Sequence, residues 1–135
     1  MTNKLEFYRC KICGNLVQVL LNGVGELICC GEAMELLEPN TNEIDMGEYH
    51  VPVFMYDKEK GDIVRVGKEP HPMTEEHHIE FIQVISNDKK CAKIHYLEPG
   101  EEPRMYLKNI MDNHGACAVE MCNLHGLWGG HNDKQ

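Results

Sequence analysis

The chain has 135 residues and a formal net charge of -9, with seven cysteines and eight histidines. No apolar run approaches the roughly 20 residues that cross a bilayer, and lysines and arginines are scattered among acids, so we expect neither membrane insertion nor nucleic-acid binding. The opening residues contain no apolar signal core, which favours a cytoplasmic location. Cysteine and histidine exceed what packing requires, which indicates metal chemistry.

The first segment, residues 1–37, contains Cys10-Lys11-Ile12-Cys13 and the adjacent pair Cys29-Cys30. Four thiols in so short a segment can form a tetrahedral site, and this geometry suits iron or zinc. Two disulfides are the alternative, which a reducing compartment disfavours. Zinc ribbons usually leave two residues between paired thiols, so the adjacent pair indicates a strained site and favours iron. A short strand at 16–21 and a turn at 22–25 leave too few apolar residues to fold without metal.

A polar, turn-rich linker at residues 38–44 leads to a second domain at residues 45–135. Short strand-like runs without helical periodicity follow one another in this domain. They lie at 51–56, 62–66, 78–85, 91–97, 104–107 and 116–121. This spacing, with no long helix for parallel crossovers, predicts an all-β chain whose second domain is an immunoglobulin-like antiparallel β-sandwich. The tail at 129–135 is expected to be loose.

A second set of metal donors is spread over the predicted sandwich. The prolines on both sides of His71 hold the chain extended and fix the direction of its imidazole. Cys122 and His125, three residues apart after a strand, can bind one metal from a tight turn. His77 and His78 point to opposite faces if a strand begins here, so at most one faces a shared metal, and we choose His77. The candidate ligands are His50, His71, His77, Cys122 and His125.

Five donors of this kind favour iron, because structural zinc takes four ligands whereas iron accepts five and leaves a sixth position for substrate. Blue copper requires a weak axial Met, and no Met follows His125. A non-catalytic metal-binding or electron-transfer module with zinc in the first site is the main alternative. The remaining candidates, His95, His114 and His131, are expected to be ordinary loop or surface residues, and Cys91 and Cys117 core thiols.

The assembled motifs resemble the desulfoferrodoxins, the two-iron class of superoxide reductase, over nearly the whole chain. The four cysteines resemble the desulforedoxin-like, rubredoxin-type iron site of that family. Its active-site signatures are matched in order by Glu48-Tyr49-His50-Val51-Pro52-Val53, Pro70-His71-Pro72-Met73, Glu76-His77-His78-Ile79-Glu80-Phe81 and Cys122-Asn123-Leu124-His125-Gly126.

The resemblance implies a one-electron reduction of superoxide to hydrogen peroxide at an Fe(His)4(Cys) centre, with a second iron as Fe(Cys)4. It assigns the first iron to Cys10, Cys13, Cys29 and Cys30, and the active-site iron to His50, His71, His77, His125 and Cys122. It also implies a homodimer and an electron donor such as rubredoxin. The Fe(Cys)4 site is then a relay or a structural site, because it offers no open position.

Two further residues enter through the resemblance. The carboxylate that matches Glu48 binds the oxidised iron after turnover in the family. Family members commonly carry Lys at the next position, whereas this chain has Tyr49, whose neutral phenol can donate a hydrogen bond but cannot attract an anion. We therefore expect weaker electrostatic steering of superoxide than in relatives with Lys.

Overall fold

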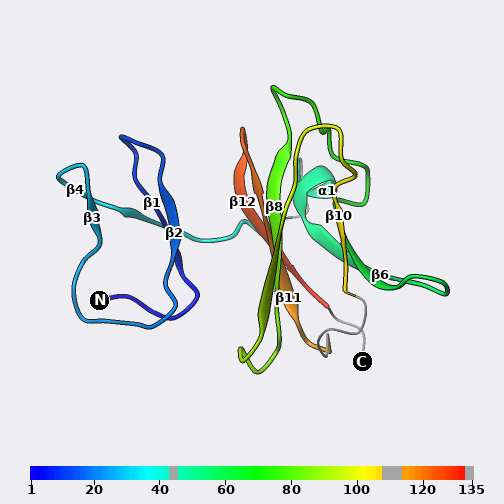
Figure 1. Ribbon diagram of the computed structural model, residues 1–135, viewed down its shortest axis with the longest axis horizontal. Helices are drawn as coiled ribbons and strands as arrows, with labels where there is room; N and C mark the ends of the chain where they lie inside the picture. The colour runs from blue at the N-terminus through cyan, green and yellow to red at the C-terminus, as the bar shows by residue number, and fades with distance from the viewer. Residues whose placement is uncertain (43–45, 108–113, 133–135) are drawn as a thin grey trace. The chain divides into compact units, whose positions relative to one another are not determined.

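The computed structural model describes residues 1–42, 46–107 and 114–132, and it divides the chain into two compact units, Met1–Glu38 and Pro39–Gln135 (Figure 1). The end of the predicted linker and the first residue of the predicted second domain, at 43–45, lie outside the described residues, as does the end of the predicted tail at 133–135. Within the described ranges no helix is long and apolar enough to cross a membrane.

The first unit is a small β-structure with little apolar core. Three antiparallel strands form a sheet in the order β2-β1-β5, and a separate hairpin pairs β3 with β4. Their bounds are β1 Phe7–Arg9, β2 Leu16–Gln18, β3 Ile28–Cys29, β4 Glu32–Ala33 and β5 Glu35–Leu37. Phe7, Cys10 and Val19 are its buried apolar residues. So small a core agrees with the expectation that bound metal contributes to folding.

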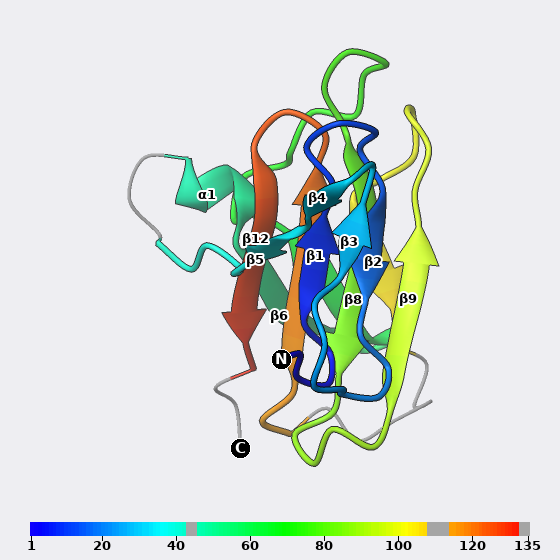
Figure 2. The same ribbon diagram turned by 90° about the vertical axis from the view of Figure 1, so that its left-hand side faces the viewer.

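The second unit is a sandwich of two antiparallel sheets. One sheet has the order β12-β11-β8-β9 and the other β10-β7-β6. The bounds are β6 Pro52–Asp57, β7 Gly61–Val66, β8 Ile79–Ile85, β9 Ala92–Tyr96, β10 Arg104–Tyr106, β11 Cys117–Cys122 and β12 Gly126–His131, with one short helix, α1 Gly47–His50. Figure 2 shows β12, β8 and β9 in order across the first sheet. The predicted all-β, immunoglobulin-like sandwich is confirmed.

Alternation of side chains places the core between these sheets. Val64 and Val66 on β7 face Ile82 and Val84 on β8, and all four are fully buried. The same buried cluster contains Phe54, Ile79, Leu97, Met105, Leu107, Ala116, Ala118 and Cys122. The metal-ligand candidate Cys122 thus lies at the end of a strand that contributes Ala118 to the same core.

The predicted loose tail is wrong for residues 129–131, which belong to β12. This strand pairs along its length with β11, from Cys122↔Gly126 to Cys117↔His131. Its glycines have low strand propensity, so the sequence did not indicate a strand here, but they allow close packing. A Cβ on Gly130 would lie 2.6 Å from the Pro52 carbonyl oxygen, so no side chain fits there.

Candidate metal centres

The four cysteines of the first unit converge on one point. Their sulfur atoms all lie within 4.8 Å of one another, with Cys13 Sγ 3.5 Å from Cys29 Sγ and Cys29 Sγ 4.0 Å from Cys30 Sγ. Cys10 is buried and also accepts the Cys13 backbone N–H at 3.4 Å. The arrangement is a four-sulfur donor set of the kind that holds iron or zinc tetrahedrally.

Backbone conformation explains how adjacent cysteines can share one site. Successive side chains of a strand point to opposite faces, so Cys29 and Cys30 in extended conformation would diverge. Cys30 instead has a φ of 52°, in the left-handed region, and Gly31 continues there at 76°. This turn directs both sulfurs to the same side, at a backbone cost of about 1–2 kcal/mol for a non-glycine residue.

The thiols of this cluster perturb one another. Hydrogen bonding from the Cys13 backbone lowers the pKa of Cys10 to about 7. The Cys13 side chain raises the pKa of Cys29, and it raises the pKa of Cys30 to about 12. Four thiolates at this spacing repel one another, so they ionise together only around a cation. The donor set therefore fits a bound metal.

Five further donors meet at one end of the sandwich, although they come from three separate stretches of chain. His50 ends α1, His71 and His77 lie between β7 and β8, Cys122 ends β11, and His125 lies in the turn to β12. Ligand atoms of His50, His77, Cys122 and His125 all lie within 4.8 Å of one another. His71 Nε2 lies 3.1 Å from His50 Nε2 and 3.5 Å from Cys122 Sγ, so it completes the group.

The four imidazoles form a square. Neighbouring ring centroids are 4.6 Å apart for His50–His71 and His71–His77, and 5.0 Å apart for His77–His125 and His50–His125. The His50–His77 diagonal is longer, at 6.4 Å. Neighbouring rings are close to perpendicular, with interplanar angles of 73° to 86°. Four nitrogens can therefore surround one ion, with the Cys122 sulfur as a fifth donor.

Hydrogen bonds on the far side of two rings decide which nitrogen faces the centre. His50 Nδ1 donates to the Met46 carbonyl at 2.8 Å, and His71 Nδ1 donates to the Pro72 carbonyl at 2.6 Å. Burial lowers the pKa of both histidines, that of His71 to about 4, so both rings are neutral near pH 7. Both Nε2 atoms then present lone pairs to each other at 3.1 Å with no hydrogen between them.

A cation removes this conflict, because metal-bound imidazoles usually donate the other ring N–H to a carbonyl or carboxylate. His77 Nε2 supports the same conclusion, since it is buried and has no hydrogen-bond partner among the described residues. His125 turns Nδ1 toward the Cys122 sulfur, at 3.8 Å. The residues present thus fit a metal held by three Nε2 atoms, one Nδ1 atom and one sulfur.

Cys122 supplies the buried side of this centre. Burial raises the pKa of its thiol, while backbone N–H groups of Leu124 and His125 oppose the shift. The sulfur has no exposed surface to water, so a cation must support its thiolate form. His125 is exposed and His77 is partly exposed, so solvent reaches the centre from the imidazole side.

Trp128, which the sequence analysis did not single out, packs behind two of the histidines. Its ring stacks on His50, with centroids 4.7 Å apart and an interplanar angle of 20°, and its Nε1 donates to the His125 carbonyl at 3.0 Å. It is almost fully buried and is the only tryptophan of the chain. Its place three residues after His125 was the available signal.

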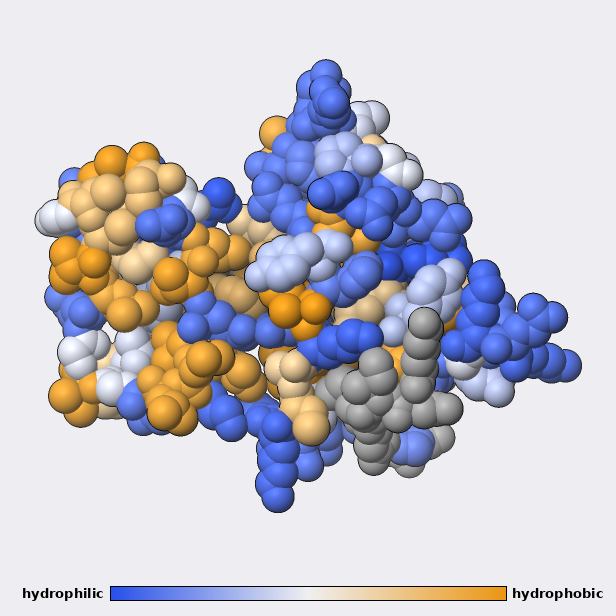
Figure 3. All heavy atoms as spheres, in the orientation of Figure 1, coloured by the Kyte–Doolittle hydropathy of each residue, from blue (hydrophilic) through white to orange (hydrophobic). Residues whose placement is uncertain are grey.

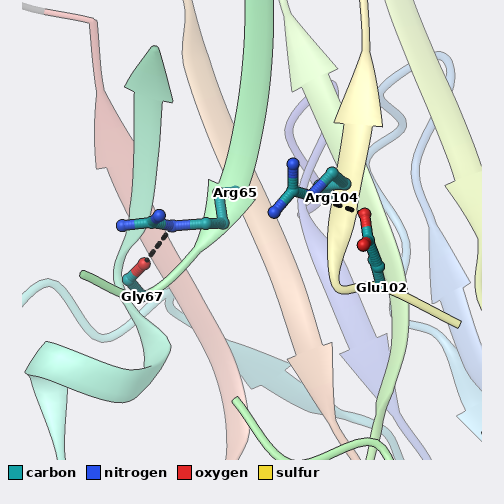
Figure 4. A network of polar contacts seen from close by, with 4 residues as sticks. All are labelled: Arg65, Gly67, Glu102 and Arg104. Atoms are coloured by element: carbon teal, nitrogen blue, oxygen red, sulfur yellow. Dashed lines mark hydrogen bonds and ion pairs between the residues drawn. The ribbon is translucent and has the colours of Figure 1, made fainter. Parts of the chain in front are cut away.

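Helix α1 rests on the turn that follows β7. Gly67 donates its N–H to the Val51 carbonyl and Glu69 donates to the Glu48 carbonyl, each at 3.1 Å. Arg65 holds this turn, donating from Nε to the Gly67 carbonyl at 3.1 Å. It lies beside the ion pair between Glu102 and Arg104, the first residue of β10 (Figure 4). Because His50 is the last residue of α1, the turn sets its position.

Glu120 is a second residue that the sequence analysis missed. It lies on β11 two residues before Cys122, is fully buried, and neither carboxylate oxygen has a hydrogen-bond partner among the described residues. Burial raises its pKa well above the usual 4.5, which favours the protonated carboxyl in the folded chain. An acidic residue in a strand otherwise rich in apolar residues was the only sign of it.

The structure places the other named residues away from the donor cluster. Glu48 and Tyr49 precede His50 on α1, and both side chains are exposed. The His78 ring is 3.0 Å from the Thr74 carbonyl rather than in the square. His95, His114 and His131 are exposed. The expectation of a core thiol is wrong for Cys91, which is exposed because it directly precedes the edge strand β9. Cys117 is partly buried.

Two separate donor groups in an all-β chain define a metalloprotein with two centres. The family model described as Desulfoferrodoxin matches residues 42–131, and the model described as Desulfoferrodoxin, N-terminal domain, matches residues 2–37. The chain therefore belongs to the desulfoferrodoxin family, and its two donor groups match the two iron centres implied by the sequence resemblance.

Individual relatives agree. A desulfoferrodoxin of Syntrophotalea carbinolica is 46% identical over 129 residues, covering 95% of this chain and 97% of the relative. A superoxide reductase of Thermococcus kodakarensis is 39% identical over 97 residues, covering 61% of this chain and 84% of the relative. The crystal structure of the superoxide reductase from Treponema pallidum matches with a TM-score of 0.68 and 25% identity, covering 96% of this chain and 99% of that one.

Gly67→Ala is expected to disrupt the sandwich centre. Gly67 has a φ of +79°, and an added Cβ would lie 2.5 Å from the Tyr49 carbonyl oxygen, so α1 and His50 must move. We expect metal affinity to fall by about 10- to 100-fold, the range for lost support of a ligand. Gly61→Ala is the control, because Gly61 has the same φ of +79° but nothing within 4 Å of the added Cβ.

Chelator titrations of both variants measure this difference, and thermal unfolding measures the strain that they share, about 1–2 kcal/mol. Equal metal affinities in Gly67→Ala and Gly61→Ala would contradict the role of the turn.

Glu120→Gln is expected to change how stability depends on pH. The raised pKa of Glu120 means that the folded chain keeps a proton that the unfolded chain releases above about pH 4.5. Its contribution to stability is therefore complete below that pH and is lost as pH rises, by up to about 1.4 kcal/mol per pH unit. Thermal unfolding between pH 5 and pH 8 should show that the stability of the variant, relative to that of wild type, increases as pH rises. A difference that stays constant over this range would show that no buried proton is involved.

Proposed function

We propose that this protein is a superoxide reductase, which reduces superoxide by one electron, with two protons, to hydrogen peroxide and releases no oxygen. The observation that carries the proposal is the square of four imidazoles with the Cys122 sulfur as fifth donor. Five donors that leave one side accessible to solvent favour a centre with room for a small substrate. The names of the Thermococcus kodakarensis and Treponema pallidum relatives support the same activity.

The side chains of this chain have distinct tasks in the proposal. His50, His71, His77, His125 and Cys122 hold the iron, which supplies the electron and an open coordination position when bound. Trp128 covers one face of His50 and keeps water from the buried side. The thiolate of Cys122 would donate electron density to a metal bound there, which would favour loss of an electron by that metal.

We assign to Glu48 the role of binding the oxidised centre after turnover, and to Tyr49 hydrogen bonding to the bound product. Both lie on α1 directly before His50, and their exposed side chains are free of the core.

The Fe(Cys)4 site, with Cys10, Cys13, Cys29 and Cys30, serves as an electron relay or a structural site in this proposal. The domains follow the same division: residues 1–37 for this site, a linker at 38–44 and the catalytic sandwich at 45–135. A donor such as rubredoxin supplies electrons. A reducing cytoplasm is the proposed location, because it keeps these thiols available to the metal.

A homodimer is the proposed assembly, and exposed apolar side chains of the first unit support it. They gather on its surface in Figure 3, and the most exposed belong to Val24, Leu21, Met1, Leu20, Ile12 and Ile28, at 91%, 86%, 81%, 73%, 59% and 58%. Apolar patches of this kind mark association surfaces in small proteins.

The activity is tested by the stoichiometry of peroxide. With an excess of reductant, the iron-loaded protein should form one peroxide for each superoxide consumed, whereas dismutation forms half as much.

Cys122→Ser should lower the rate by more than about 100-fold, because loss of an outer partner of a ligand alone costs about 10- to 100-fold. Cys13→Ser is the control with the sandwich centre intact, and chemically reduced protein of this variant should still react. Dismutation stoichiometry, or two tightly bound metals with no consumption of superoxide, would refute the proposal.

Tyr49→Lys is expected to accelerate the reaction with superoxide. The chain has 22 acidic and 13 basic side chains, so the anion approaches against a negative field. A cation beside His50 should raise the association rate within the roughly 10- to 1000-fold range that such fields supply, and the gain should fall with ionic strength. Tyr56→Lys, at a tyrosine that is 67% exposed on β6, adds the same charge elsewhere. Rates measured against salt that fall equally steeply in wild type and both variants would contradict local steering.

A further inference from the structure

We infer that Asn123 is a positioning residue of the sandwich centre and that it fixes the place of the His77 imidazole through the backbone on both sides of it. The inference rests on the iron centre proposed above. It concerns a residue that lies between two ligand candidates, Cys122 and His125, in the turn from β11 to β12.

Three hydrogen bonds join Asn123 to the segment that carries His77. The side-chain Nδ2 donates to the Glu76 carbonyl at 3.0 Å, and Oδ1 accepts the His78 N–H at 2.9 Å. The backbone N–H of Asn123 donates to the His78 carbonyl at 3.1 Å. The amide side chain therefore holds the residue before His77 and the residue after it, and both its donor and its acceptor are used.

His77 needs this support more than the other imidazoles do. His50 and His71 each have a ring nitrogen bound to a carbonyl, and His125 belongs to the same turn as Cys122. The described residues supply no hydrogen bond to the His77 ring, and its Nε2 is buried without a partner. Beside its ring contacts with His71 and His125, its place therefore depends on its backbone.

The backbone around His77 is a closed turn that leads directly into β8, whose first residue, Ile79, pairs with Cys122. Thr74 accepts the His77 N–H with Oγ1 at 3.1 Å, and the His77 carbonyl accepts the Thr74 N–H at 2.9 Å. These bonds fix the shape of the turn but tie it to nothing outside residues 74–78. Asn123 joins it to the Cys122–His125 turn. The distance between these two ligand-bearing segments, which lie 45 residues apart in the sequence, is therefore fixed.

Asn123→Ala tests this role in the full, iron-loaded chain. We expect release of iron from the sandwich centre to a chelator to be about 10- to 100-fold faster than in wild type, as for other lost outer partners of ligands. Trp128 stacks on His50 and is the only tryptophan, so recovery of its fluorescence reports emptying of this centre. The four-cysteine site is an internal reference, and its visible absorption should decay at the wild-type rate.

Asn87→Ala is the matched control, since Asn87 is an exposed asparagine beyond the opposite end of β8. It should release iron at the wild-type rate. Wild-type release from Asn123→Ala, or equal acceleration by Asn87→Ala, would overturn the inference.

A double-mutant cycle separates positioning of His77 from general loosening. In a His77→Ala background the ligand that Asn123 holds is gone, so Asn123→Ala should change iron release by less than about twofold. In a His125→Ala background it should keep most of its effect. The same acceleration in the presence and absence of His77 would show that Asn123 acts on the fold instead, and would overturn the inference.

Asn123→Asp serves if the alanine variant does not fold, because it keeps the acceptor for the His78 N–H and loses only the donor to Glu76. It should release iron at a rate between wild type and the 100-fold limit, and a wild-type rate would again overturn the inference. Iron release is measured without superoxide. A protein that binds iron through this clamp but does not reduce superoxide would refute the proposed function alone.

Discussion

The sandwich centre depends on one electrostatic constraint, which is that buried imidazole nitrogens face one another with no hydrogen between them. Carbonyls of Met46 and Pro72 take the Nδ1 protons of His50 and His71, and burial keeps both rings neutral. The two lone pairs at 3.1 Å repel each other until a cation lies between the rings. The close placement of these side chains therefore indicates that a cation binds between them.

The same constraint links the thiol to the imidazoles. Burial opposes ionisation of Cys122, and the convergent nitrogens oppose one another, so each half of the donor set is unfavourable until a cation joins them. The fold supplies the rigidity that this requires. Cys122 ends a fully paired central strand, and α1 is held by backbone hydrogen bonds to the turn at Gly67. Stability of the sandwich is thus what keeps the donors together.

Much of this architecture could be predicted from residue patterns, because alternation and turn residues mark most of the strands. The runs at 62–66 and 78–85 correspond to β7 and β8 almost residue for residue. β12 was missed because Gly126, Gly129 and Gly130 have low strand propensity. Close approach of Pro39 and Pro52 explains Gly129 and Gly130, and it is visible only in three dimensions. Helix α1 was missed for a similar reason, since four residues carry no periodicity.

The donor residues could be identified from spacing and from the family resemblance, but their supports could not. Trp128 and Asn123 act through contacts with segments far away in the sequence. Glu120 looks like an ordinary strand residue until its burial is known. The adjacent cysteines were interpreted as a sign of strain, and the strain is the left-handed backbone conformation of Cys30.

The two donor sets have no residue in common, and each is held by hydrogen bonds within its own unit. Selection can therefore adjust the reduction potential of one iron without disturbing the other. A lineage that loses the amino-terminal cysteines would keep every ligand of the second centre, so the two sites can evolve as separate modules on a single polypeptide.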